Sequence, residues 1–556
     1  MKKICLSLLA LVFGLSWAQD KKDDHAFKVM KQLEIFNEAI TELDQYYVDT
    51  LDVEKKLTEA IHYVMSSVDP YTEYYPESDS HVLKEMRTGK YAGIGSPIYY
   101  RPDLKRCVFN SPYFNMPAGK AGLRTGDIVL RIDSLDMTLK DGEDSQDFLS
   151  RVTDHLRGEA GSSFQLYVKR PFVKDSLLTF TLTRQMIVQP SVPFTYMTAD
   201  SIGYIRLQSF IENTTAEFKR AFMALKQQGM KQLVIDLSQN GGGLMDEAVN
   251  LVGLFVPRGT KVVETKSKMT WIDEVSLTSE QPIDTQIPIA VMVDGATASA
   301  AEITSGALQD YDRAVIIGDR TYGKGLVQTT RQLPYNTSVK LTVSRYIIPS
   351  GRCVQAYKYE NGRPVYQADS LAKTFYTQNG RPVKDGGGIM PDIEALDTLV
   401  SNVAAAIDGS LPFSDFCVRY RNTHDRIAPA KDFRLTEEEY ESFKTFMLES
   451  DFKFQSNSNR ILDLLKEAAK REDKTDFETS AEFKAIQEIF KPNLELDLIK
   501  NKAVLKELLE MRIIAMYYDS KGVFEYFESK DKAFQSALGV LRDSKTYHEI
   551  LSGKKK

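Results

Sequence analysis

The chain has 556 residues, of which 42% are hydrophobic and 27% charged, and its formal net charge is −6. A single hydrophobic core rarely grows beyond about 250–300 residues, so this length predicts several domains. The ordinary composition argues against long disordered stretches, and the mild acidity argues against general binding of nucleic acid.

The N-terminus has the pattern of a secretory signal peptide. Lys2 and Lys3 precede an apolar run from Ile4 to Trp17, and small residues at Ser16 and Ala18 frame a cleavage site. The run is shorter than the ~20 residues that a membrane span needs. We therefore expect residues 1–18 to be removed and the mature protein to be periplasmic or secreted. Anchoring by an uncleaved signal is the alternative.

Three cysteines, Cys107, Cys353 and Cys417, follow this segment and lie far apart, so at most one disulfide can form. No CxxC or HExxH spacing occurs, which argues against structural or catalytic zinc. We expect no metal in the site.

Hydrophobic periodicity changes along the next part of the chain. Residues 24–85 have apolar residues at helical spacing, which predicts an N-terminal helical region. Residues 86–188 instead contain short alternating strands separated by glycine turns, which predicts a mostly β domain. Pro190 and Pro193 then mark a linker.

Residues 189–398 predict an α/β core with largely parallel strands. A strand at 202–207, a helix at 213–228 and a continuous apolar strand at 232–237 follow one another. Apolar runs at 287–293 and 314–317 repeat the buried type of strand, as in a sheet covered on both faces. Two Asn-Gly pairs, at 361–362 and 379–380, predict turns. Residues 399–556 predict a charged helical region, with one apolar helix face over 505–516.

The core contains no histidine, since none occurs between His155 and His424. Ser299 follows an apolar strand and precedes a helix-favouring run, so it is expected at a strand-to-helix turn, where helix N–H groups can stabilise an oxyanion. A plain helix N-cap is the commoner role for such a serine. A serine nucleophile needs a base, and Lys324, between Gly323 and Gly325, is the candidate that the core offers.

Lys324 can act as a base only if its amine is neutral. Burial would have to lower its pKa from about 10.4 to about 7–8. In an extended strand Gln328 lies on the same face as Lys324, so its amide is expected to orient the amine. An exposed turn lysine and an ordinary strand glutamine are the alternatives.

Gly241, Gly242 and Gly243 follow the strand at 232–237, and their N–H groups form a candidate anion-binding nest. We expect Gly242 or Gly243, together with the Ala300 N–H, to form an oxyanion hole, with a tight turn as the alternative. Residues 318–324 also fit the first seven positions of a P-loop. The eighth position is Gly325, which has no hydroxyl for Mg²⁺, and the segment that follows favours a strand, so we expect no nucleotide cofactor.

At these residues the sequence resembles the C-terminal-processing, or tail-specific, serine peptidases, which use a Ser-Lys dyad often supported by a glutamine. Ser238 and Gly241 depart from the family pattern, in which arginine and proline or serine are common at these positions. The resemblance covers roughly residues 28–395 and rests on five segments: 236–243, 297–303, 321–328, 345–352 and 388–393. It implies a core akin to Clp protease and crotonase, with Ser299, Lys324 and Gln328 as the catalytic residues.

The resemblance also implies that residues 86–188 form an inserted PDZ domain. Tyr91-Ala92-Gly93-Ile94-Gly95 is similar to a PDZ carboxylate-binding loop, and residues 118–129 are similar to the usual internal motif. The N–H groups of Gly93, Ile94 and Gly95 would hold the terminal carboxylate of a peptide that adds a strand to the sheet edge.

We therefore expect a periplasmic or secreted serine endopeptidase that captures the C-terminal tails of protein substrates. It would need no metal, nucleotide or nucleic acid, and no transmembrane span beyond the signal. The C-terminal helices would serve an adaptor or self-association. A non-catalytic peptide-binding scaffold and a crotonase-like acyl-CoA enzyme are the alternatives on the same fold.

Overall fold

The computed structural model describes residues 2–366, 370, 372–395, 400–454, 456–474 and 476–554, and within them the side chains from residue 24 onward except 80 and 81. The predicted signal peptide, residues 1–18, therefore lies outside the described side chains. The chain forms two compact units. The first comprises Met1–Ser78, Thr330–Leu341 and Tyr359–Arg363, and the second comprises Asp79–Thr329, Thr342–Lys358 and Pro364–Lys556.

The first unit contains two helices and a short strand. Helix α1 (Lys2–Tyr46) is followed by α2 (Val53–Ser66), which begins where the Asp52 carboxylate accepts a hydrogen bond from Lys55 N. Strand β1 (Glu73–Tyr75) pairs antiparallel with the first residues of β18 (Ser338–Ile347). The two helices lie in the region that the sequence predicted to be helical, where β1 is a strand that helical periodicity did not predict.

The second unit begins with helix α3 (Ser80–Thr88) and a mostly β region, as predicted. Strand β2 (Lys90–Gly93) pairs with β9 (Gln185–Val188). A separate sheet has β3 at its edge, and helices α4 (Pro117–Lys120) and α5 (Ser145–Leu156) belong to the same region. Its strands run in the order β3 (Ile98–Arg101), β4 (Arg106–Phe109), β5 (Ile128–Ile132), β7 (Ser163–Lys169) and β8 (Leu177–Thr183), with β6 (Leu135–Asp136) beside β5.

The α/β core is built on a sheet of six strands, parallel from β11 to β23, with β10 antiparallel at one edge. The order is β10 (Thr195–Met197), β11 (Ile202–Arg206), β12 (Gln232–Asp236), β15 (Ile289–Val293), β16 (Val315–Gly318) and β23 (Ile393–Glu394). Phe218, Leu251 and Leu308 are buried in the core formed with α6 (Thr214–Gln227), α7 (Met245–Gly253) and α8 (Ala300–Asp310). The mixed α/β fold agrees with the sequence prediction.

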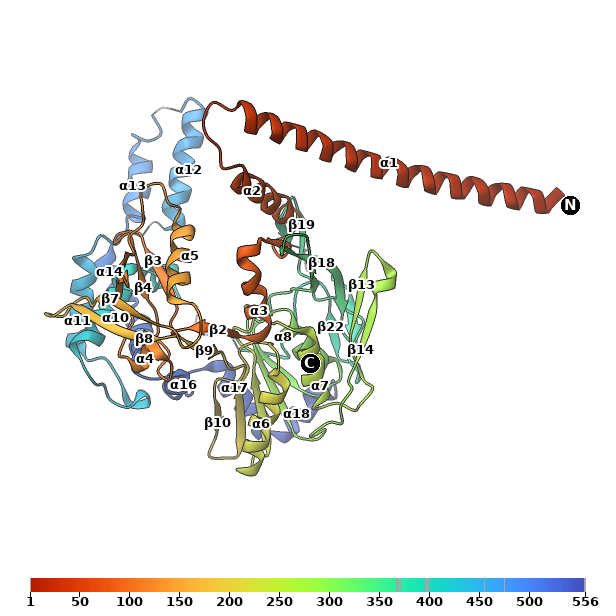
Figure 1. Cartoon of the computed structure of the whole chain (residues 1–556). Helices are drawn as coiled ribbons and strands as arrows, with labels where there is room; N and C mark the ends of the chain where they lie inside the picture. Colours follow the sequence, from red (N-terminus) through yellow and green to blue (C-terminus); the bar gives the residue numbers. More distant parts are fainter. Residues whose placement is uncertain are drawn as a thin grey trace. The chain divides into compact units, whose positions relative to one another are not determined.

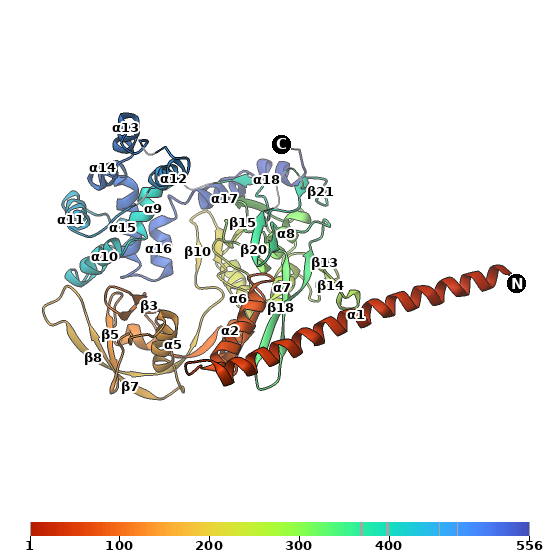
Figure 2. The same cartoon turned by 90° about the horizontal axis from the view of Figure 1, so that it is seen from above.

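The other face of this sheet is covered by the last helices of the chain. Helices α16 (Ser520–Phe527), α17 (Lys532–Arg542) and α18 (Ser544–Leu551) bury Phe534, Leu538 and Tyr547 against strand residues that include Val234 and Met292. Figures 1 and 2 show α17 and α18 beside the core strands. The sequence prediction assigned these helices to a separate region that begins at residue 399. In the structure they cover one face of the core sheet and so complete the core.

A smaller antiparallel layer joins β13 (Lys261–Ser267) to β14 (Glu274–Leu277) and to the second half of β18, beside β17 (Leu326–Gln332). Both predicted Asn-Gly turns are present. Asn361 and Gly362 have positive φ angles of 51° and 72° between β19 (Tyr357–Glu360) and β20 (Arg363–Tyr366). Residues 379–380 lie in the hairpin of β21 (Thr374–Tyr376) and β22 (Pro382–Lys384).

A further core lies around Phe413, Phe443 and the predicted apolar face, including Leu505, Leu509 and Ile513. The helices that build it are α9 (Asn402–Asp408), α10 (Leu411–Thr423), α11 (Glu437–Leu448), α14 (Leu494–Lys500) and α15 (Lys502–Ile514). Between α11 and α14 the chain forms α12 (Asn457–Arg471) and α13 (Ala481–Ile489), whose buried residues lie outside this core.

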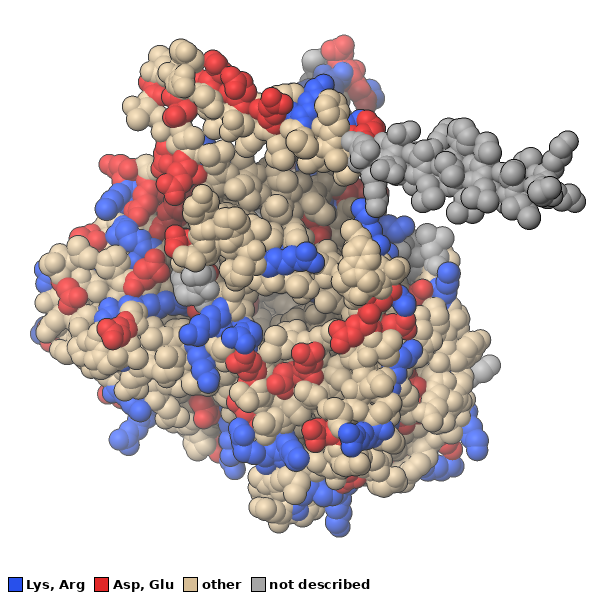
Figure 3. Space-filling model, turned by 45° about the vertical axis from the view of Figure 1, so that its right-hand side comes forward, with Lys and Arg blue, Asp and Glu red and all other residues tan. Residues whose placement is uncertain are grey.

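Charge and cysteine placement agree with the composition. Basic and acidic side chains are interspersed on the face shown in Figure 3. Cys107, Cys353 and Cys417 are free thiols. Among the described residues, no helix combines the length and apolar character needed to cross a bilayer.

Candidate active site

Ser299 occupies the turn between β15 and α8, where the sequence predicted it. Its backbone has φ 56° and ψ −117°, a conformation that L residues rarely adopt and that costs about 1–3 kcal/mol. A strained strand-to-helix turn of this kind presents a nucleophile at the end of a sheet. The Asp294 carboxylate holds the turn, because it accepts hydrogen bonds from the N–H groups of Ala296 and Thr297 at 3.0 and 2.9 Å. Ser299 itself is half-buried.

The loop after β12 lies directly against this turn. A Cβ added to Gly242 would come within 2.8 Å of both Ala300 N and Ser299 Cβ, so only a glycine allows the approach. Asn240 joins the loop to the Ser299 turn, because its backbone carbonyl oxygen accepts a hydrogen bond from Ala298 N at 2.9 Å. Its side-chain amide donates to Leu207 O at 2.8 Å. The predicted oxyanion residues therefore lie together beside Ser299.

The N–H groups in this loop are used differently. Gly242 N–H donates to the side-chain oxygen of Asn240 at 2.9 Å. In the part of the chain that the structure describes, the N–H groups of Gly243 and Ala300 have no such intramolecular acceptor. Of the two expected glycines, Gly243 therefore has the freer donor.

Glu302 brings the lysine segment to the Ser299 turn. One carboxylate oxygen accepts from Ser299 N at 2.9 Å and from Lys324 N at 2.8 Å. The other oxygen accepts from the Thr321 hydroxyl at 2.6 Å and from Gly323 N at 2.7 Å. Glu302 is fully buried, and this burial raises its pKa from the ordinary 4.5 despite the four hydrogen bonds. A buried carboxylate thus fixes the Ser299 turn and the Lys324 segment relative to each other.

Tyr346 of β18 connects the same two segments through their carbonyl groups. Its hydroxyl lies 2.6 Å from Lys324 O and 3.2 Å from Ser299 O, and the residue is 1% exposed. Lys324 is half-buried and lies two residues before β17. The backbone N–H groups of Ser299 and Lys324 are therefore linked through Glu302, and their backbone carbonyl groups through Tyr346.

Gln328 lies on β17 as predicted, and its amide nitrogen donates to the Thr342 hydroxyl at 3.2 Å. This bond holds the amide toward β18. Its expected role in orienting the Lys324 amine stays a prediction.

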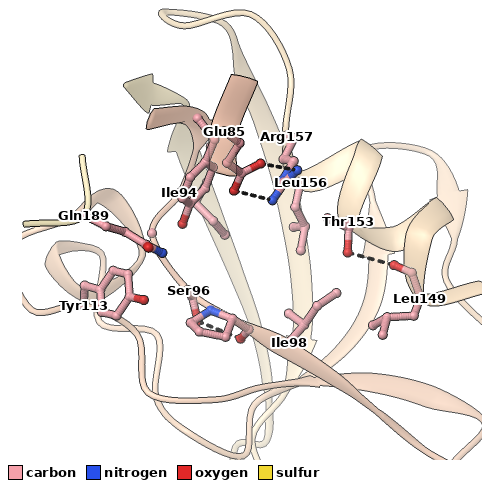
Figure 4. Close-up of a pocket in the computed structure, with 14 residues that line it drawn as sticks. Glu85, Ile94, Ser96, Ile98, Tyr113, Leu149, Thr153, Leu156, Arg157 and Gln189 are labelled. Atoms are coloured by element: carbon pink, nitrogen blue, oxygen red, sulfur yellow. Dashed lines mark hydrogen bonds and ion pairs between the residues drawn. The ribbon is translucent and has the colours of Figure 1, made fainter. Parts of the chain in front are cut away.

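The predicted carboxylate-binding loop borders a separate cavity of about 270 Å³. Ile94 lies at its wall, and Gly95 has a φ of 73° at a position where a Cβ would clash with Met116. An ion pair between Glu85 of α3 and Arg157, 3.0 Å long, lies beside the cavity (Figure 4). The rest of the wall has apolar side chains, among them Ile98, Leu149 and Leu156, and polar ones, Ser96, Thr153 and Gln189.

Sequence reasoning gave no role to Glu302, Tyr346, Asn240 or Asp294. One signal was present, since Glu302 stands three residues after Ser299, the spacing of a capping box. The contacts of Tyr346 and Asn240 join segments far apart in the chain, which no local pattern reveals.

Comparison with known proteins shows what this chain is similar to. The family model described as peptidase family S41 matches residues 201–362. The carboxy-terminal-processing protease of Bartonella bacilliformis is 31% identical over 348 residues, which cover 61% of this chain and 76% of that protein. The chain belongs to peptidase family S41. It is therefore a protease of the serine type.

Other S41 relatives match in part. The chloroplastic C-terminal processing peptidase of Tetradesmus obliquus is 35% identical over 296 residues, which cover 51% of this chain but only 62% of that protein. A solved structure of a photosystem II D1 C-terminal processing protease is 30% identical, covers 60% of this chain and 90% of its own, and has a TM-score of 0.34. Residues 403–541 match a model described as the C-terminal helical domain of a probable PDZ-protease.

Proposed function

We propose that this S41 peptidase cleaves peptide bonds with a Ser299–Lys324 dyad. The observation that carries the proposal is the pair of bridges, through Glu302 and Tyr346, that places the Lys324 backbone beside the strained Ser299 turn. In an S41 chain with no histidine between residues 155 and 424, lysine is the base that this arrangement brings to the serine.

The reaction follows from these positions. Ser299 Oγ attacks the scissile carbonyl while the neutral Lys324 amine takes its proton, and the resulting ammonium protonates the leaving amine. Water then attacks the acyl carbonyl while Lys324 accepts its proton. The acyl–Oγ bond breaks, the ammonium returns the proton to Ser299 Oγ, and the carboxylic acid product leaves. The N–H groups of Ala300 and Gly243, or Gly242, hold the oxyanion, and Gln328 orients the amine. No step requires a metal or a nucleotide.

The test is cleavage of an unstructured protein by wild type and by the Ser299→Ala and Lys324→Ala variants, with Lys268→Ala as a control at an exposed lysine. We expect both site variants to lose turnover by at least about a thousandfold. Equal turnover by all four proteins would disprove the dyad. Binding of the protein without turnover by wild type would favour the scaffold.

The pH–rate profile tests the neutral amine. A free lysine has a pKa of about 10.4, so a functioning base must have a lower value. We expect an acidic limb near neutrality in wild type. The Lys324→Cys variant has a thiol in place of the amine, and chemical modification of this cysteine restores an amine of different pKa. Each change in the pKa of the base should move this limb. A limb that stays in place would assign it to another group.

We also propose that residues 86–188 are a PDZ domain that captures substrate tails. The edge position of β3, the partly apolar cavity and the Gly93–Gly95 loop support this assignment. A peptide with a free C-terminal carboxylate should bind, whereas the same peptide with an amidated end should bind at least about tenfold more weakly. Equal binding of the two peptides would contradict carboxylate capture.

The predicted location and partners complete the proposal. The Lys2-Lys3 segment and the apolar run that follows support export to the periplasm or beyond. The helices matched by the second family model are a candidate surface for adaptor or self-association.

A further inference from the structure

Three tyrosine rings form a row beside the lysine segment, all within the second compact unit. The ring centroids of Tyr322 and Tyr357 lie 5.9 Å apart, and those of Tyr357 and Tyr366 lie 5.7 Å apart. Both outer residues are open to solvent, since Tyr322 is 41% exposed and Tyr366 is 49% exposed. A contiguous group of exposed aromatic residues marks a candidate binding surface.

A backbone contact places the start of this row next to the Ser299 turn. Tyr322 N–H donates to Thr297 O at 3.0 Å, two residues before Ser299. Tyr322 is also two residues before Lys324, so the Cα atoms of these two residues lie at most about 7 Å apart. The row therefore begins at the two segments that carry the proposed dyad.

The middle tyrosine is held against the glycines that flank Lys324. Ala356 N–H donates to Gly323 O at 2.9 Å, and a Cβ added to Gly323 would lie 2.4 Å from Ala356 Cβ. The Gln355 side chain accepts from Gly325 N at 2.7 Å and donates to Tyr357 O at 2.7 Å. The lysine segment and the start of β19 are therefore packed together, and the position of Tyr357 is fixed relative to both.

Arg320 lies at the far end of the row. Its guanidinium donates to the Tyr366 hydroxyl at 2.8 Å and, through Nε, to Met390 Sδ at 2.8 Å. A basic side chain at this end would meet a like charge. An aromatic or large apolar side chain can pack against the rings without that penalty, so the row fits this class of side chain.

The length of the row suits a short stretch of peptide. Extended chain advances by about 3.3 Å per residue, so three rings at these spacings span roughly three to four residues. Tyr357 and Tyr366 also lie between residues 345–352 and 388–393, two of the segments that carry the resemblance to other tail-specific peptidases. The row is therefore not explained by that resemblance.

We propose that Tyr322, Tyr357 and Tyr366 form a specificity site for an aromatic or large apolar side chain of the substrate, within about four residues of the scissile bond. The proposal rests on the proposed peptidase function and names a preference of that same site. The rings would select the substrate by binding it and would take no part in bond cleavage.

The test uses peptides that share one free C-terminal tail, so that any capture by residues 86–188 is the same for all. Each peptide carries Phe, Leu, Ala or Lys at one position on either side of the cleaved bond. At the best position we expect kcat/KM for Phe to exceed that for Ala by at least about tenfold, mainly through KM. The Tyr322→Ala and Tyr366→Ala variants should reduce this ratio to about two or less.

Two further variants serve as controls. Tyr322→Phe keeps the ring and should keep the wild-type ratio. Tyr335→Ala removes a tyrosine that is 89% exposed at the turn between β17 and β18, away from the row, and should also keep it. Because Tyr322 and Tyr366 are exposed, their alanine variants are expected to keep the wild-type unfolding midpoint.

Peptide binding separates this proposal from the peptidase mechanism. In the Ser299→Ala variant, fluorescence anisotropy should find that the Phe peptide binds at least about fivefold more tightly than the Ala peptide. Adding Tyr322→Ala should remove the difference. This binding result in a chain whose wild type cleaves no peptide would disprove the dyad and retain the site.

Three results would overturn the specificity site. Phe and Ala peptides could be cleaved and bound equally at every position, Lys could be preferred over Phe, or both alanine variants could retain the wild-type ratio. Cleavage that depends on Ser299 and Lys324 but shows no aromatic preference would overturn the site alone and retain the dyad.

Discussion

The same two side chains, Glu302 and Tyr346, link the backbone of Ser299 to the backbone of Lys324. The Glu302 carboxylate accepts hydrogen bonds from their N–H groups at 2.9 and 2.8 Å, and the Tyr346 hydroxyl lies 3.2 and 2.6 Å from their carbonyl oxygens. The relative position of the two backbones is thus set by the fold before substrate arrives. Such preorganisation lowers the cost of reaching a reactive geometry.

Replacing Tyr346 with phenylalanine should slow the chemical step. The change removes the hydroxyl between the two segments and little else, so we expect kcat to fall about 10–100-fold, or about 1.4–2.7 kcal/mol, with KM nearly unchanged. Tyr311→Phe is the matched control, since its hydroxyl donates to Lys261 O at 2.5 Å away from the site. Equal kcat values for the two variants would show that Tyr346 has no special role.

Glu302→Gln should be more damaging. Both carboxylate oxygens accept two hydrogen bonds, whereas a glutamine amide would turn its NH₂ group toward one pair of donors. Each buried donor left without an acceptor costs about 1–3 kcal/mol, so we expect lower stability together with a loss of activity above about a hundredfold.

Glu510→Gln separates the two effects of that change. Glu510 is buried in the C-terminal helical core, where it accepts from Leu435 N at 2.8 Å and from the Tyr526 hydroxyl. Its variant should lose stability in urea unfolding but keep the wild-type kcat at temperatures where the protein is folded. If both variants lose activity in proportion to stability, Glu302 is only structural.

The raised pKa of Glu302 predicts a pH dependence of stability. Because burial raises the pKa above 4.5, the folded chain keeps this proton at pH values where the unfolded chain has lost it. The contribution of Glu302 to the free energy of unfolding therefore falls as the pH rises from 4.5 through the folded-state pKa. Glutamine does not titrate, so the stability of wild type relative to Glu302→Gln should decrease across this window.

Urea unfolding of both proteins from below pH 4.5 to neutrality checks this sign. Asp310 and Asp392 also have pKa values raised by burial, but both proteins contain them, so their effect cancels in the difference. A difference that grows with pH would mean that hydrogen bonding to the Glu302 carboxylate outweighs its burial.

The sequence predicted what depends on local pattern. The strand before Ser299, the helix after it and the strand that begins after Gly325 all lie where apolar runs and glycines indicated. A continuous apolar strand such as β12 correctly signalled a sheet covered on both faces.

What covers those faces depends on contacts between distant segments. The Tyr547 hydroxyl lies 2.9 Å from Ile289 N, a contact across most of the second half of the chain. The helix pattern around Tyr547 shows an apolar face but not its partner. The bridging roles of Glu302 and Tyr346 were hidden for the same reason, because a carboxylate or hydroxyl gives no sign in the sequence of which backbone it will meet.

Gly242→Ala tests the contact between the loop after β12 and the Ser299 turn. Gly242 has a φ of 94°, and an added Cβ would lie 2.7 Å from Ala298 O and 2.8 Å from Ala300 N. These are backbone atoms, so the loop must move away from Ser299. We expect kcat to fall at least about a hundredfold, as when an oxyanion donor is lost.

Gly229→Ala isolates the conformational part of this effect. Gly229 has nearly the same φ, 95°, but no heavy atom lies within 4 Å of the position that an added Cβ would occupy. Its alanine variant therefore suffers the same backbone strain, about 1 kcal/mol or more of stability, without a steric clash at the site. Peptidase assays should find Gly229→Ala active and Gly242→Ala inactive, with both folded by circular dichroism. A fully active Gly242→Ala would contradict a catalytic role for the N–H groups of this loop, because the added Cβ must displace them.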